Sequence, residues 1–141
     1  MYKILLPVDG SASSEHAARH VVELARVVGE LDAHLLFVHP RVDSWEVKRF
    51  LRKDEVDSLL NEQAVEAMRV ASAILAAASI QHERHAATGE IADTIADMVA
   101  ACGCNQIIMG CRGMGSLQGL LLGSVSTKVL RLVSVPVTLV K

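Results

Sequence analysis

The chain alternates short apolar runs with longer stretches in which apolar residues recur every three or four positions. Four apolar runs are too short for helices and are typical of strands buried on both faces: residues 2–8, 33–38, 106–110 and 135–140. Four stretches show helical spacing: residues 17–28, 60–78, 91–99 and 125–133. A more polar segment at residues 81–86 is the fifth expected strand. This alternation predicts one α/β domain with a mostly parallel, doubly wound sheet, covered by helices on both faces.

Composition limits the size of the fold and the classes of partner. With 141 residues, 51% of them hydrophobic and 21% charged, we expect a single domain over residues 1–141. A net charge of −2 and only 3% aromatic residues give no basis for binding nucleic acid. No apolar run approaches the roughly 18 residues of a membrane span. Three cysteines without a zinc-type arrangement, and a start that runs directly into a strand, favour the cytoplasm.

Three glycines in the last third of the chain have a spacing that packing alone does not require. Gly110, Gly113 and Gly123 lie between an apolar run and a helical stretch, and Ser124 follows the last of them directly. Main-chain amides that are free of side chains at the start of a helix often hold phosphate. The pattern therefore predicts a nucleotide site.

The expected topology brings a second feature to the same place. Open parallel sheets bind ligands beyond the carboxyl ends of their strands, where the strand order reverses. Asp9 and Gly110 both follow or end apolar runs. We therefore expect them on one edge of the sheet.

The glycines do not form either of the better-known phosphate motifs. The sequence has no P-loop, and Gln118 stands where the dinucleotide fingerprint requires a third glycine after Gly113 and Gly115. The chain instead resembles the universal stress proteins, in the branch of that family that binds ATP. The resemblance extends over essentially the whole chain and depends on ILLPVDGS at 4–11, MGCRG at 109–113, LLGSV at 121–125 and VPV at 135–137. It implies a five-stranded parallel sheet in the order 3-2-1-4-5.

The resemblance also implies where the nucleotide binds. Asp9 matches the acidic residue near the ribose and phosphates, and its carboxylate could help to hold Mg or Mn with ATP. Pro7 and Val8 precede it, and Val38 matches the position whose backbone meets adenine. Two loops match the phosphate and ribose contacts: Met109, Gly110, Arg112 and Gly113 in the first, and Gly123, Ser124, Val125 and Ser126 in the second. Ser124 is also a candidate N-cap for the helix that follows.

Three functions agree with these residues. The first is an ATP-binding protein in which the nucleotide sets a conformational or assembly state in a stress response. The second is an enzyme, either a slow ATPase or a protein that phosphorylates itself on Ser124, Ser126 or Thr127. The third is a dimeric scaffold with a vestigial pocket. The family commonly dimerises along its last strand, here residues 136–141, and a regulatory protein partner would remain to be identified.

The remaining histidines and cysteines suggest no metal site from their spacing. His16 and His20 are four apart on the polar side of a helix, and we expect them to be solvated. His82 and His85 are three apart on a strand, so they should point to opposite faces. Cys102 and Cys104 are expected to be unreactive, buried thiols.

Overall fold

The computed structural model describes residues 1–40, 52–111 and 123–141. Its sheet has five parallel strands in the order β3-β2-β1-β4-β5. The strands are β1 (Tyr2–Pro7), β2 (Leu31–His39), β3 (Gln81–Thr88), β4 (Gln106–Gly110) and β5 (Val137–Val140). The helices are α1 (Ala12–Val28), α3 (Lys53–Ala77), α4 (Ile91–Cys102) and α5 (Ser124–Leu132). The expected α/β class and strand order are both confirmed.

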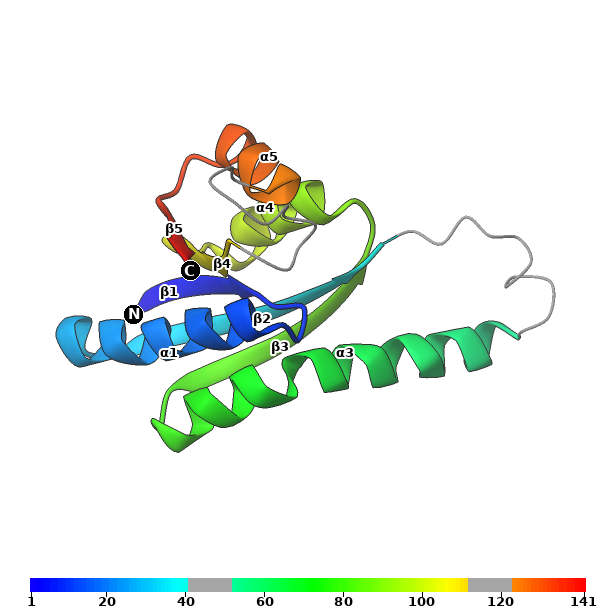
Figure 1. Ribbon diagram of the computed structural model, residues 1–141, viewed down its shortest axis with the longest axis horizontal. Helices are drawn as coiled ribbons and strands as arrows, with labels where there is room; N and C mark the ends of the chain where they lie inside the picture. Colours follow the sequence, from blue (N-terminus) through cyan, green and yellow to red (C-terminus); the bar gives the residue numbers. More distant parts are fainter. Residues whose placement is uncertain (41–51, 112–122) are drawn as a thin grey trace.

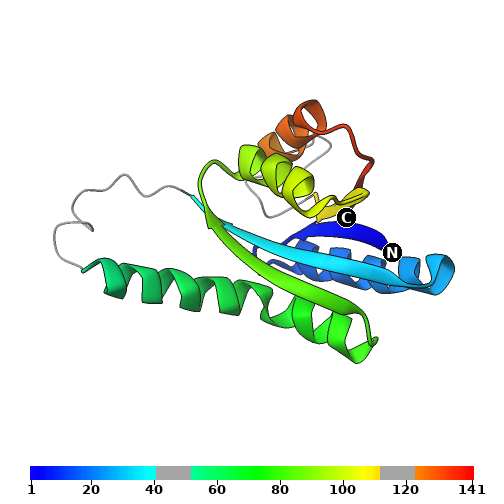
Figure 2. The same cartoon turned by 180° about the vertical axis from the view of Figure 1, so that it is seen from behind.

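The sheet is covered on both faces, as Figures 1 and 2 show from opposite sides. Helices α1 and α3 pack on one face against Ile4, Leu6 and Leu35. Helices α4 and α5 pack on the other face against Leu5 and Leu36. Consecutive residues of β1 and β2 thus enter opposite cores, which is why these strands consist of continuous apolar runs rather than alternating patterns.

Two glycines end helices. Gly29 follows α1 with φ of 83°, and Gly103 follows α4 with φ of 65° in the left-handed region. Glycine adopts this backbone without the clash that a Cβ would cause. Each therefore allows the chain to turn toward the next strand.

Several elements differ in extent from the expectation, among them β3, α3 and β5. Strand β3 continues to Thr88, because each of its residues pairs with a residue of β2 from Asp32 to His39. Helix α3 begins at Lys53, several residues before its apolar face. Strand β5 begins only at Val137, after Pro136, which has no amide hydrogen to donate, although its carbonyl accepts from Ile107 at 2.9 Å.

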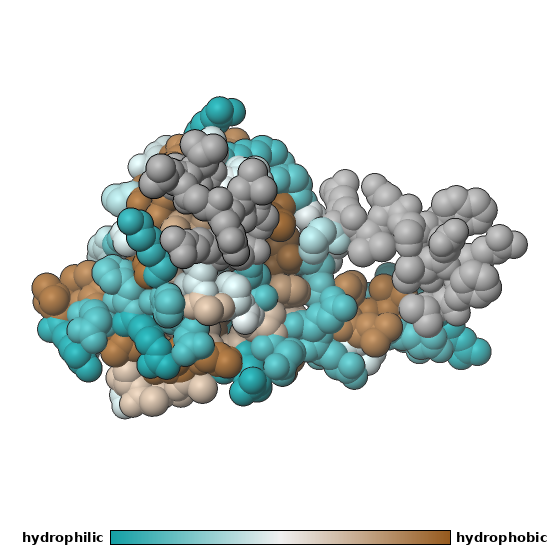
Figure 3. Space-filling model, viewed as in Figure 1, coloured by the Kyte–Doolittle hydropathy of each residue, from teal (hydrophilic) through white to brown (hydrophobic). Residues whose placement is uncertain are grey.

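The surface of the molecule has both hydrophilic and hydrophobic areas. Figure 3 shows a largely hydrophilic face with separate hydrophobic areas at the outer end of α1 and over part of α3. Val27 and Val28 are exposed at the end of α1, and Leu59 is exposed on α3. Among the helices of the described residues, none combines the length and the apolar character needed to cross a membrane.

Candidate functional site

Strands β1 and β4 are neighbours whose following helices lie on opposite faces of the sheet. After β1 the chain enters α1 on one face, whereas the helix that comes after β4 is α5 on the other. The carboxyl ends of these two strands therefore form the point at which the topology reverses, where open α/β sheets bind ligands. Asp9 lies just beyond β1, and Gly110 is the last residue of β4.

The carboxylate of Asp9 is held by the first turn of α1. Its Oδ1 accepts hydrogen bonds from the Ser11 amide at 2.9 Å and from the Ser14 hydroxyl at 2.7 Å. Ser11 is also the N-cap of α1, since its side chain accepts from the Ser14 amide at 3.2 Å. Within the described residues no hydrogen bond to Oδ2 is found, so one oxygen is fixed and the other is available.

Four of the expected site residues can offer a ligand only their main chains. The side chains of Pro7, Val8, Val38 and Met109 are buried, and three of these residues belong to the apolar cores. The Val8 amide is already paired with the Leu36 carbonyl at 2.9 Å. At this edge of the sheet these residues therefore present main-chain groups and no polar side chains.

Gly110 has a packing role that the sequence did not reveal. A Cβ at this position would lie 2.7 Å from the carbonyl carbon of Ser13 and 2.8 Å from its Cβ, and it would also meet the Ser13 hydroxyl. Contacts to a backbone atom at this distance cannot be relieved by rotating a side chain. Glycine is needed here because the start of α1 lies against the end of β4.

The N-terminus of α5 is the second segment that the sequence assigns to phosphate binding. Gly123, not Ser124, occupies the N-cap position, and the expectation that Ser124 caps this helix is wrong. The Gly123 carbonyl accepts from both the amide and the hydroxyl of Thr127, each at 3.0 Å. No side chain caps this end among the described residues. The first-turn amides of Ser124, Val125 and Ser126 are thus available to an anion.

The hydroxyls near this helix end differ in access. Ser124 is exposed, whereas Ser126 is buried. Of these two serines, Ser124 is therefore the one whose hydroxyl is open to solvent. Arg112 and Gly113, the other expected phosphate contacts, lie outside the described residues.

An open groove of about 560 Å³ adjoins Asp9 on the α3 side of the sheet. Gly10 lies at its base with φ of 82°, and a Cβ there would lie 3.5 Å from Cα of Ala67 on α3. Glu62 and Glu66 also line the groove. Their charges oppose phosphate, so a nucleotide's anionic end would be favoured toward α5 instead.

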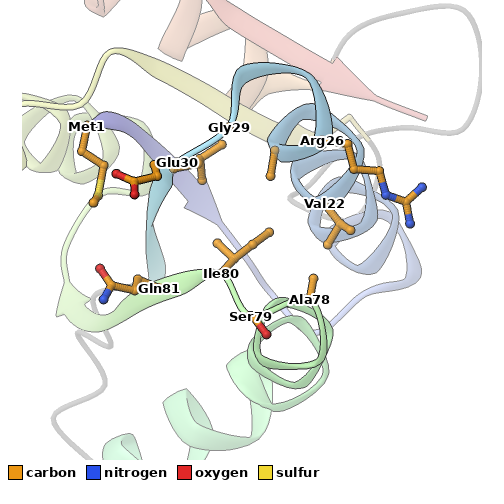
Figure 4. Close-up of a pocket in the computed structure, with 11 residues that line it drawn as sticks. Met1, Val22, Arg26, Gly29, Glu30, Ala78, Ser79, Ile80 and Gln81 are labelled. Atoms are coloured by element: carbon orange, nitrogen blue, oxygen red, sulfur yellow. The ribbon is translucent and has the colours of Figure 1, made fainter.

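A different cavity, of about 770 Å³, lies at the amino ends of the strands (Figure 4). It is bordered by Gly29 after α1 and by Ala78 after α3, so two helix C-termini are directed toward it. The partial negative charge of these ends disfavours anions. Arg26 belongs to the border but points away from the cavity in Figure 4 and pairs with Glu23 at 2.9 Å. This cavity does not suit a phosphate.

A group of polar side chains on the α4 face was missed by sequence reasoning. The rings of His34 and His85 stack with centroids 5.2 Å apart, and His34 Nδ1 lies 3.0 Å from His85 Nε2. Burial lowers the pKa of His85, and the neighbouring His34 lowers it further. Burial likewise raises the pKa of Cys102, and it raises the pKa of Cys104 to about 11.

The prediction for the histidine pair on β3 is confirmed. His82 faces α3, where its Nε2 lies 2.7 Å from the Ser72 hydroxyl, and His85 faces the opposite side. His16, also as expected, is exposed on α1. The juxtaposition of His85 with His34 depends on the register between β2 and β3, which the spacing within one strand does not reveal.

Comparisons with known proteins agree along the whole chain. The model of a family described as the universal stress protein family matches residues 1–141. The universal stress protein YxiE of Bacillus subtilis is 30% identical, over 99% of this chain and 98% of that protein. The structure of the hypothetical protein MJ0577 is 28% identical, has a TM-score of 0.84 and covers 99% of this chain and 95% of its own.

Two more distant structures share the fold and contain adenine nucleotides. The universal stress protein of Archaeoglobus fulgidus in complex with dAMP is 22% identical, with a TM-score of 0.69, and the match covers 100% of this chain and 98% of that one. A universal stress protein family protein of Arabidopsis thaliana with AMP bound is 16% identical, with a TM-score of 0.72, and the match covers 100% and 92%.

Proposed function

Because this chain belongs to the universal stress protein family, we propose that it binds an adenine nucleotide at the carboxyl edge of the sheet, between β1 and β4. The observation that carries the proposal is the carboxylate of Asp9, which is fixed at the topological reversal; the uncapped N-terminus of α5 supports it as an anion-binding segment. The nucleotides in two structures of the same fold support the ligand class.

Each part of the nucleotide has a chemically suited partner. The free oxygen of Asp9 accepts a ribose hydroxyl or binds the metal of Mg-ATP or Mn-ATP. Main-chain groups beside Val8 and Val38 meet the adenine. The amides of Gly123 to Ser126 hold phosphate together with Gly110, Arg112 and Gly113. One carboxylate plus phosphate oxygens is a donor set that suits Mg²⁺, which keeps several of its waters.

ATP acts in this proposal as a regulatory ligand rather than as a rapidly consumed substrate. Fast hydrolysis needs a positioned water and a base near the terminal phosphate. Asp9 is committed to α1 and to the nucleotide. The Lys128 ammonium is paired with Glu90 at 3.2 Å and with Asp93 at 3.5 Å, so it is not directed at the site. Slow self-phosphorylation would fall to Ser124, whose side chain is exposed.

The proposal includes a cytoplasmic homodimer formed from domains of residues 1–141. Within the described part of the chain, β5 pairs only with β4, which leaves its outer edge open. Its four residues are half-buried and apolar at three positions. Such an edge tends to be covered by another chain. A molecular mass of one chain by light scattering at micromolar concentration would contradict this part.

The binding function is tested on freshly purified protein without added nucleotide. Mass spectrometry of the denatured protein should release an adenine nucleotide, because retention through washing needs a Kd near micromolar or tighter, about −8 kcal/mol. Calorimetric titration of the stripped protein with ATP, ADP and AMP then ranks the ligands. Absence of both retained nucleotide and measurable heat would leave the scaffold function instead.

Incubation with γ-labelled ATP separates binding from catalysis. A regulatory site gives neither labelled protein nor phosphate release above the blank. Label that disappears in Ser124→Ala would support the self-phosphorylating alternative, and turnover without label would support the ATPase.

A further inference from the structure

Three side chains of metal-binding type meet on the α4 face of the sheet. His34 lies on β2, His85 lies on β3, and Cys102 is the last residue of α4. One ligand atom from each lies within 4.8 Å of the others. Three separate elements thus contribute to one cluster, which lies on the sheet face opposite α1 and α3.

The two imidazoles already have nearly the separation that a shared metal ion imposes. Their facing nitrogens, His34 Nδ1 and His85 Nε2, lie 3.0 Å apart. A tetrahedral ion at about 2.0–2.1 Å from each nitrogen would hold them about 3.3 Å apart. An ion therefore needs only a small opening of the pair.

A carboxylate lies beside the same two nitrogens. Glu83 Oε2 is 4.0 Å from His34 Nδ1 and 3.8 Å from His85 Nε2. Its side chain is largely exposed, so it can approach an ion from the solvent side. A fourth ligand from this carboxylate would complete a tetrahedron.

The other nitrogen of His34 lies near a carboxylate. Nε2 is buried and makes no hydrogen bond to any described residue. Asp32 Oδ2 lies 3.4 Å away, without the alignment of a hydrogen bond. A histidine that binds metal through one nitrogen commonly donates from the other to a carboxylate, which fixes the tautomer. Asp32 is placed for that role after a slight rotation of the ring.

Two negative charges lie near the cluster against one positive charge. The carboxylates of Asp32 and Glu83 flank it and favour a cation, whereas the ammonium of Lys3, which donates to the Cys102 carbonyl at 3.2 Å, opposes one. The Cys102 thiol donates to the Met98 sulfur, at 3.5 Å. Cys102 is half-buried, and its sulfur is a strong metal ligand only as the thiolate.

We propose that His34, His85 and Cys102, with Glu83 as the fourth ligand, bind a divalent transition-metal ion of the zinc class. Nitrogen and sulfur donors select zinc and similar ions over Mg²⁺ or Ca²⁺, which prefer oxygen. Binding displaces the thiol proton of Cys102 to solvent and leaves the thiolate as ligand. The ion links the end of α4 to the edge strand β3 and to its neighbour β2, so the site is structural and separate from the nucleotide edge.

Cobalt(II) titration of the metal-free protein gives the direct test, because a cobalt–thiolate bond has a charge-transfer band in the near ultraviolet. The proposal expects one equivalent of Co²⁺ to produce this band, with visible bands of a tetrahedral ion, and Zn²⁺ to abolish both by displacement. Cys102→Ser should remove the charge-transfer band, and His85→Gln should weaken cobalt binding more than a hundredfold. Asp32→Asn, which changes only the partner of a ligand, should weaken it about 10–100-fold.

Two variants serve as matched controls. His82→Gln changes a histidine on the same strand that faces α3, and Cys104→Ala removes a neighbouring thiol. Both should retain the band and the stoichiometry. Circular dichroism checks that each variant is folded. The cobalt spectrum of the unmodified protein tests the site without any substitution.

The proposal is overturned if the unmodified protein gives no saturable cobalt spectrum. It is equally overturned if the thiolate band survives in folded Cys102→Ser, or disappears in Cys104→Ala but not in Cys102→Ser. Neither result would affect nucleotide binding, which is measured at the other site.

Discussion

Gly110 lies so close to Ser13 that a Cβ on residue 110 would stand 2.7 Å from the Ser13 carbonyl carbon. The end of β4 and the start of α1 are thus held in direct backbone contact. This contact fixes the distance between the two sides of the proposed nucleotide site.

Gly110→Ala is therefore expected to destabilise the fold by about 1–3 kcal/mol, because the extra methyl overpacks a backbone contact. Urea denaturation followed by circular dichroism measures the change. Gly89→Ala is the control, since its Cβ would meet a side-chain atom, the Thr94 hydroxyl at 2.9 Å, rather than the backbone. Equal effects of the two substitutions would contradict the assignment of a packing role to Gly110.

Asp9→Asn should weaken Mg-ATP binding about tenfold to a hundredfold. The amide keeps an oxygen that can accept from Ser11 and Ser14, but it loses the charge that serves the ribose or metal, and bonds to charged groups contribute about 1.5–3 kcal/mol. Calorimetry with and without Mg²⁺ measures the loss. An unchanged Kd in both conditions would exclude Asp9 from the site.

Arg112→Ala should weaken ATP binding about tenfold or more, because a charge-assisted bond to phosphate is lost. Arg131→Ala, at the far end of α5, is a matched control that should have little effect. The loss should be larger for ATP than for adenosine. If adenosine and ATP lose affinity equally, Arg112 does not contact the phosphates.

Glu90, the N-cap residue of α4, makes the stability of the fold depend on pH. Its carboxylate accepts from the Asp93 amide at 2.7 Å, and this bond is the largest cause of its lowered pKa, with Lys128 adding to it. A group with a lowered folded-state pKa stabilises the protein above its unfolded pKa, and the effect is lost as the pH falls through the folded pKa.

Glu90→Gln should therefore reduce the free energy of unfolding at pH 7, by less than about 1 kcal/mol because the side chain is exposed to solvent. The difference from the unmodified protein should shrink as the pH falls below the carboxylate range. Denaturation curves at a series of pH values measure it. A difference that stays constant down to strongly acidic pH would contradict the helix-capping role of the charge.

The sheet could be predicted from sequence because most of its strands lie between two apolar cores. Ile4 and Leu5, for example, enter opposite cores, so β1 had to be a continuous apolar run. Strand β3 has mostly polar residues and was the least evident, since only its pairing with β2 defines its length. The start of α3 was missed because its first residues lack an apolar face.

The candidate site could be predicted only in outline. Sequence places Asp9 and Gly110 at strand ends, and topology brings them to one edge. It does not show that Gly110 is required by Ser13, or that Gly123 rather than Ser124 caps α5. The cluster of His34, His85 and Cys102 was also not predictable, because it depends on strand register and on where α4 ends.

A crystal structure of the protein grown with ATP and Mg²⁺ tests most directly whether the nucleotide binds at the carboxyl edge of the sheet. We expect nucleotide density at the carboxyl edge between β1 and β4. The phosphates should lie against the first-turn amides of α5, and Asp9 should contact the ribose or the metal. Nucleotide found instead in the cavity beside Gly29 and Ala78, or an empty carboxyl edge at saturating ATP, would contradict it.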